Sequence, residues 1–164
     1  MTDSITTFSM TAWFTVMSIS NHERKYKMKK YLNISFVYAI AAMTGGVFYR
    51  EFTKWNGFEG VTALGKVHTH LFLLGMTVFL IVSLFAAHND LKKHKTFKVF
   101  MWVYNIGVVL TSAMLVARGV PQVLSASLSS SASAAISGIA GIGHALTGTG
   151  IILLLVSLKK TAKK

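Results

Sequence analysis

The sequence predicts an all-α integral membrane protein built as a four-helix bundle. Four apolar runs are each long enough to cross the hydrocarbon core of a bilayer, which takes roughly 20 helical residues. Apolar residues make up 52% of the 164 residues and charged residues 13%, about half the charged share of an average soluble domain. Lysine and arginine also gather in alternate connections between the runs. These observations favour a multi-pass membrane protein.

The four predicted spans are continuously apolar, so we expect helices and not the alternating strands of a membrane barrel. In chain order they cover residues 31–49, 61–88, 99–117 and 134–158. Phe52, Trp55 and Phe58 follow the first span, where aromatic rings at the bilayer interface are expected. The connection 119–133 contains Pro121 and many serines, and we expect a loop, with helix as the alternative for parts of it.

The positive charges predict the orientation of the spans. Thirteen of the 17 Lys and Arg residues lie before the first span, between the second and third, or after the fourth. Because basic connections stay on the cytoplasmic side, we expect both termini inside and the protein in the bacterial cytoplasmic membrane. The net charge of +12 then reflects contact with the membrane surface, and no nucleic-acid partner is expected.

The first 27 residues are a weak candidate for a fifth span. Residues 5–20 are moderately apolar but include seven Ser or Thr residues. Met28, two lysines and an apolar run then follow, which resembles a chain start of its own. We expect residues 1–27 to be an N-terminal extension or a peripheral helix, and residues 28–164 to form the four-helix domain.

Apart from His88, the last residue of the second span, three histidines lie within the predicted spans, where ionisable side chains usually mark a functional site. His68 and His70 open the second span and His144 lies inside the fourth. Two helical residues of separation turn a side chain by roughly 200°, so His68 and His70 face opposite sides. Gly65 and Gly75 share the His68 face and leave space beside it. We therefore favour His68 as the buried ligand and keep His70 as the alternative.

The fourth span offers His68 a partner. His144 shares its face with Ala140, Gly141 and Gly148, whose small side chains permit close helix packing or the approach of a planar cofactor. The second and fourth spans run in the same direction, and the helical rise places His68 and His144 roughly 10 and 15 Å into them. Two histidines at comparable depth predict a bis-histidine haem b.

Three cations lie near the predicted outer boundary, where they suit the haem propionates: Arg50, Lys66 and Arg118. A protein of this kind would transfer electrons, with a quinone or another redox partner, or bind or sense a diatomic gas if one ligand is labile. We also expect a homo-oligomer, because one four-helix bundle offers little core to enclose a haem.

Other interpretations stay open. The chain has no cysteine, so thiolate metal sites are excluded. Imidazoles from several subunits would instead suit Cu or Zn, and the histidines of a structural accessory subunit would only bond between helices. The spans contain no paired carboxylates, and no phosphate-binding or nucleophile motif stands in its proper context. No complete catalytic site is visible, and whether the chain is an enzyme stays undecided.

Two stretches resemble known families. The segment MKKYLNISFVYAIAAMTGGVFYREFTKWNGFEGVTALGKVHTHLFLLG resembles the opening of a family of small bacterial four-helix membrane proteins of unknown function, and the resemblance continues from Met28 to the C-terminus. The nine residues VHTHLFLLG resemble the second helix of heme-copper oxidase subunit I, above all its C-type oxidase and nitric oxide reductase branch.

The second resemblance implies that His68 is an axial ligand of a low-spin haem. His70 stands where that family has Asn, and Gly75 matches its downstream small residue. The oxidases have twelve spans and a second, His-rich copper centre. Four spans lack such a cluster, so we expect no complete oxygen-reducing site in one chain.

Overall fold

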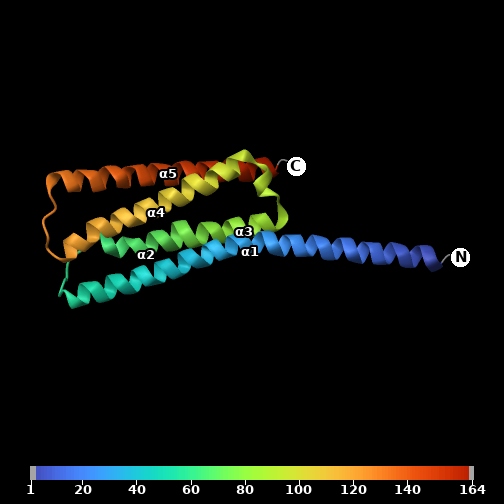
Figure 1. The fold of residues 1–164 in the computed structure, drawn as a ribbon, viewed down its shortest axis with the longest axis horizontal. Coiled ribbons are helices and arrows are strands. Elements are labelled where there is room, and N and C mark those ends of the chain that lie inside the picture. Colours follow the sequence, from blue (N-terminus) through green and yellow to red (C-terminus); the bar gives the residue numbers. More distant parts are fainter. Residues whose placement is uncertain (1–2, 163–164) are drawn as a thin grey trace.

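Four helical rods make up the part of the chain that the computed structural model describes, residues 3–162, with side chains from residue 22 onward. The first rod is the single helix α1 (Asp3–Trp55) (Figure 1). The second rod consists of four consecutive segments: η1 (Ala63–Lys66), α2 (Val67–His70), η2 (Leu71–Thr77) and α3 (Val78–His88). After the short turn η3 (Leu91–Lys93), the third rod is α4 (Lys95–Val123), and the fourth is α5 (Ser130–Ala162). No strand occurs in this range.

Each rod is long and apolar enough to cross a membrane. The qualifying stretches are His22–Trp55, Ala63–His88, Lys95–Val123 and Ser130–Ala162. They cover the four predicted spans except for Val61 and Thr62, with ends displaced by up to nine residues. The prediction of an all-α protein with four membrane-length helices is therefore confirmed, and the protein is of the multi-pass membrane class.

The first helix is much longer than the predicted span of residues 31–49. It continues without a break from Asp3 to Trp55, and its N-terminal part runs well beyond the bundle (Figure 1). No glycine or proline occurs before Gly45, so no residue interrupts the helix after it leaves the apolar region. Hydropathy marks where a span ends, whereas the helix itself ends at Trp55, directly before the turn at Asn56 and Gly57.

Helices α4 and α5 pack with their backbones close together. A Cβ atom added at Gly107 would lie 2.6 Å from the backbone nitrogen of Thr147, and one added at Gly143 would lie 2.6 Å from Oγ1 of Thr111. Glycine is required at both positions because a methyl group would push the helices apart. Small residues drive close contact of this kind in membranes, where burial from water contributes little.

Aromatic and hydroxyl side chains join α1 to the second and third rods. The Tyr38 ring of α1 stacks on Phe79 at 5.7 Å, and its hydroxyl donates to Oδ1 of Asn105 on α4 at 2.8 Å. Ser35 donates to the carbonyl oxygen of Met76 at 2.8 Å. Inside the membrane such polar groups need protein partners, so these bonds fix the order of the helices.

The surface of the bundle is apolar. The exposed fraction is 75% for Trp102, 65% for Leu73 and 59% for Leu155. A soluble monomer rarely carries an apolar surface of this extent, whereas lipid tails would cover it.

Candidate functional site

Two of the three intramembrane histidines face one another across the bundle. His70 ends α2, and His144 lies in the middle of α5. Their ring centroids are 6.2 Å apart and their ring planes are nearly perpendicular, at 88°. The second and fourth rods thus bring two imidazoles together within one chain.

Both of these histidines are held in the same tautomer. Nδ1 of His70 lies 2.8 Å from the carbonyl oxygen of Lys66, and Nδ1 of His144 lies 2.8 Å from that of Ala140. A carbonyl oxygen only accepts a hydrogen bond, so each Nδ1 carries the proton and donates it. Each Nε2 is left with a free lone pair. Metal-binding histidines are oriented in this way, by a hydrogen bond on the nitrogen opposite the metal.

His68 points away from this pair, toward α1. Its ring stacks on Tyr49 with a centroid distance of 6.4 Å and an angle of 14°, and it packs beside Gly46. Its Nδ1 is buried and has no hydrogen-bond partner among the described residues. The structure therefore separates His68 from His144, which the sequence had favoured as its partner, and brings His144 to His70, the alternative.

The glycines on the His68 face explain this difference. A Cβ atom at Gly65 would lie 3.2 Å from the Tyr49 ring, and a Cβ atom at Gly75 would clash with the ring of Tyr38. Both glycines make room for the tyrosines of α1. The space beside Gly75, assigned to a cofactor from the sequence, is filled by a neighbouring helix.

The chain changes its helical winding directly after His70. Residues Leu71–Thr77 form the π-helical segment η2, and the hydroxyl of Thr77 donates to the carbonyl oxygen of Phe72, five residues earlier, at 3.0 Å. A π-helical insertion is costly and occurs frequently at functional sites. Here it adjoins the histidine that faces α5.

The His144 face of α5 is open on both sides of the imidazole. Gly141 lies one turn before His144 and Gly148 one turn after it, and a Cβ atom at either position would meet no neighbouring group within 4 Å. His144 is itself exposed. Unlike the glycines that face α4, these two have no packing partner within the described bundle, so a flat molecule would reach the helix backbone here.

Two of the three predicted cations lie toward the same end of this open face. Arg118 donates through Nη2 to Oγ of Ser137 at 2.7 Å, and Ser137 precedes His144 by two turns on α5. Lys66 precedes His70 by one turn and is exposed. Arg50 lies on α1, where its Nε is 3.7 Å from a carboxylate oxygen of Glu51. The ion pair with Glu51 is the interaction that the described residues show for the Arg50 side chain.

No group of three or more His, Cys, Asp or Glu side chains suited to a metal ion occurs in the described residues. The pair His70–His144 therefore offers two protein ligands within one chain. The number of protein ligands that one chain supplies limits which cofactor it can hold.

Two contacts of this region were not predicted from the sequence. Tyr49 stacks on His68, and Ser137 fixes the Arg118 side chain between α4 and α5. The sequence does indicate a place for Ser137, because it precedes His144 by seven residues and therefore lies on the same face of the helix. No signal in a single sequence identifies Tyr49, because its contact depends on how α1 is paired.

Comparison with known proteins gives one match. The model of the DUF2871 family, described as a protein of unknown function, matches residues 28–161. The chain belongs to this family. No curated protein and no solved structure matches the chain. The resemblance of its second rod to heme-copper oxidases gains no support from these comparisons.

Membership of the DUF2871 family agrees with the first resemblance noted in the sequence. The matched range contains all three intramembrane histidines and all four membrane-length stretches except the outermost residues. It begins at Met28, so the whole of the predicted N-terminal extension, residues 1–27, lies outside it. The family carries no described activity, and the function must be inferred from the site.

Proposed function

We propose that this DUF2871 protein binds haem b in the membrane, with His70 and His144 as its two axial ligands. The observation that carries the proposal is the matched pair of imidazoles, each with its Nδ1–H bonded to the carbonyl four residues earlier. This arrangement leaves two Nε2 lone pairs on facing helices. Bundles supply haem ligands in the same way, from side chains on facing helices.

The spacing of the rings suits one metal ion between them. An imidazole–metal bond of about 2 Å on each side places the two ring centroids about 6 Å apart. The observed 6.2 Å is close to this separation. The open helix face at Gly141 and Gly148 leaves room for the edge of a macrocycle.

The number of ligands favours haem over a bare metal ion. Zinc sites take three or four protein ligands, whereas a haem iron needs at most two because its macrocycle supplies four nitrogens. A Cu or Zn site at His70 and His144 would require a further ligand from another subunit. Arg118 and Lys66, which lie toward one end of the site, suit the two propionates of a haem.

The role we propose is one-electron transfer, with the haem iron alternating between ferric and ferrous states. Binding of a diatomic gas is the second role, and it requires that one of the two histidines leave the iron. His144 is exposed in the single chain, so we further propose that a second copy covers this face. The basic connections favour a cytoplasmic membrane location with both termini inside.

Optical spectra of the detergent-purified protein, air-oxidised and then reduced with dithionite, test this function. We expect a Soret band and sharp α and β bands on reduction, which indicate low-spin haem. The variants His70→Ala and His144→Ala should each lose these bands. His68→Ala is the matched control, because His68 lies two residues from His70 but faces α1, and it should keep them.

Other spectra would contradict the assignment. A wild-type protein that is colourless although haem is supplied would exclude the haem and direct attention to Cu or Zn analysis. Loss of the bands in His68→Ala but not in His70→Ala would restore the pair favoured by the sequence. A colourless, metal-free protein destabilised by all three substitutions would indicate a structural accessory subunit.

A further inference from the structure

A pocket of about 610 Å³ opens at the end of the bundle where α3 turns into α4. Three lysines from three different elements line it: Lys30 of α1, Lys92 of η3 and Lys98 of α4. Its remaining walls are mostly aromatic and apolar, and include Phe97 and the largely exposed Trp102. Positive charge thus surrounds the mouth of an apolar hollow, beside a tryptophan of the kind found at bilayer interfaces.

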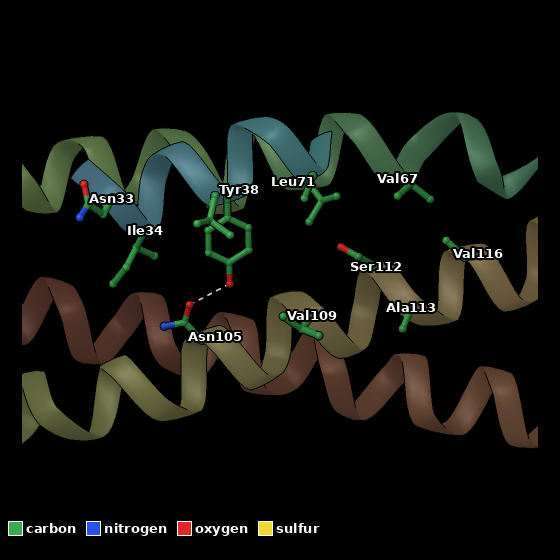
Figure 2. A pocket seen from close by; sticks show the side chains of 12 residues that line it. Asn33, Ile34, Tyr38, Val67, Leu71, Asn105, Val109, Ser112, Ala113 and Val116 are labelled. Atoms are coloured by element: carbon green, nitrogen blue, oxygen red, sulfur yellow. Dashed lines mark hydrogen bonds between the residues drawn. The ribbon is translucent and has the colours of Figure 1, made fainter. Parts of the chain in front are cut away.

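A second cavity, of about 650 Å³, continues from this pocket between α1 and α4 (Figure 2). The two share Ile34 and Asn105 in their walls. The lining beyond Asn105 is almost entirely aliphatic, with Val37 and Val109 among its residues. The side-chain oxygen of Asn105 already accepts a hydrogen bond from the hydroxyl of Tyr38, which is drawn in Figure 2. The two hollows form one groove, basic at its mouth and apolar along its length.

The lysines at the mouth are not neutralised by the protein. Asp90 is the acidic residue nearest in sequence to Lys92, but its carboxylate pairs with Lys27 at 3.6 Å and with Lys93 at 3.3 Å. None of the ion pairs between described side chains uses Lys30, Lys92 or Lys98. An anion at the mouth would meet three uncompensated positive charges.

The length of the groove suits an acyl chain. From Lys98 to Val116 it follows eighteen residues of α4, or about 27 Å at the helical rise. Half of the roughly 30 Å hydrocarbon core of a bilayer is about 15 Å. The groove is therefore long enough to hold an acyl chain that is anchored by its head group at the lysines and reaches the bilayer midplane.

We propose that this groove binds one anionic phospholipid, with its phosphate at Lys30, Lys92 and Lys98 and an acyl chain between α1 and α4. Basic pockets between membrane helices bind anionic lipid head groups by the same electrostatics. A zwitterionic lipid carries its own cation beside the phosphate and would gain less from the three lysines than an anionic lipid, and an uncharged quinone has no negative charge for them to attract. The site is distinct from the histidine pair and does not depend on haem binding.

Native mass spectrometry of the full-length, detergent-purified protein tests the proposal, with phosphatidylglycerol or phosphatidylcholine added. We expect one phosphatidylglycerol molecule per chain, bound at least about tenfold more tightly than phosphatidylcholine. The double variant Lys92→Gln/Lys98→Gln should lose this selectivity. The matched control Lys159→Gln/Lys160→Gln removes the same charge from the last turn of α5 and should keep it.

A second variant tests the apolar part of the groove. Ala41 lines the cavity and is exposed, so Ala41→Phe should fill the groove while the protein remains folded, and it should weaken binding of both lipids. Equal binding of the two lipids by wild type would overturn the proposal, as would equal losses in the two lysine double variants. Occupancy by a neutral quinone, with no preference for anionic lipid, would also overturn it.

Discussion

At the scale of single residues, the glycines of this protein serve two different purposes that their sequence spacing does not separate. Gly75 accommodates the ring of Tyr38, whereas Gly138, Gly141 and Gly148 have open space where a Cβ atom would lie. The first kind holds helices together. The second kind leaves a helix face bare, and it is the second kind that surrounds His144.

This distinction predicts opposite effects of alanine. Gly75→Ala should lower the free energy of unfolding by roughly 1–3 kcal/mol, because the added methyl overpacks the contact with Tyr38. Gly138→Ala should leave it unchanged or raise it by up to about 1 kcal/mol, since alanine favours an open helical position. The Tm of each purified variant in detergent checks both. Equal losses at the two sites would contradict the assigned packing.

The Asp90 carboxylate predicts a small dependence of stability on pH. Although partial burial acts to raise the pKa of Asp90, hydrogen bonds and charges from Lys93 and Lys27 outweigh it and hold the pKa below its ordinary value. Its ion pairs therefore stabilise the fold above the ordinary pKa, and this contribution is lost as the pH falls through the lowered value.

The loss should be less than about 1 kcal/mol, because the pairs are partly exposed. Thermal unfolding of wild type and Asp90→Asn between pH 6 and pH 3 measures it. The variant should be less stable at pH 6, and the difference should disappear at the acid end. A difference that grows on acidification would show that the pairs are not what stabilises this connection.

At the scale of helices, the sequence predicts the four elements well and their pairing poorly. Hydropathy and the 20-residue requirement locate all four spans. The continuation of α1 far beyond the bundle is not predictable from apolarity, because charged residues such as Lys, Arg and Glu have helix propensities similar to that of Leu. Nor does any periodicity indicate the π-helical segment Leu71–Thr77.

The pairing of the helices also explains why the sequence favours His68 as the partner of His144, whereas the structure brings His70 to it. The sequence correctly places His68 and His70 on opposite faces, because that follows from helical geometry alone. Which face meets α5 depends on the order of the helices, and that order is fixed by contacts such as Tyr38 with Asn105 and Gly107 with Thr147. These contacts join residues 40 or more positions apart. Small residues alone are ambiguous, because they admit an aromatic ring as readily as a cofactor.

At the scale of the whole molecule, charge divides the bundle into two ends. The turn between α3 and α4 and the last turn of α5 are rich in lysine, whereas the connection between α4 and α5 carries no charge. The proposed haem site lies nearer the poorly charged end, and the proposed lipid site lies at the basic end. The orientation of the chain therefore decides which side of the membrane each would serve.

Single cysteines test this orientation cleanly, because the chain has none of its own. Ala126→Cys lies in the connection between α4 and α5, and His94→Cys lies between α3 and α4. In intact cells a membrane-impermeant maleimide should label Ala126→Cys, and it should label His94→Cys only after permeabilisation. The reverse pattern would place the basic end outside and contradict the charge rule for this protein.

The most direct test of the central claim is titration of the purified, full-length protein with ferric haem, followed by its Soret band. We predict saturation at one haem per chain with a low-spin spectrum in wild type and in His68→Ala, and none in the double variant His70→Ala/His144→Ala. Uptake that does not saturate, or that is the same in the double variant as in wild type, would show only partition of haem into detergent and would contradict ligation by His70 and His144.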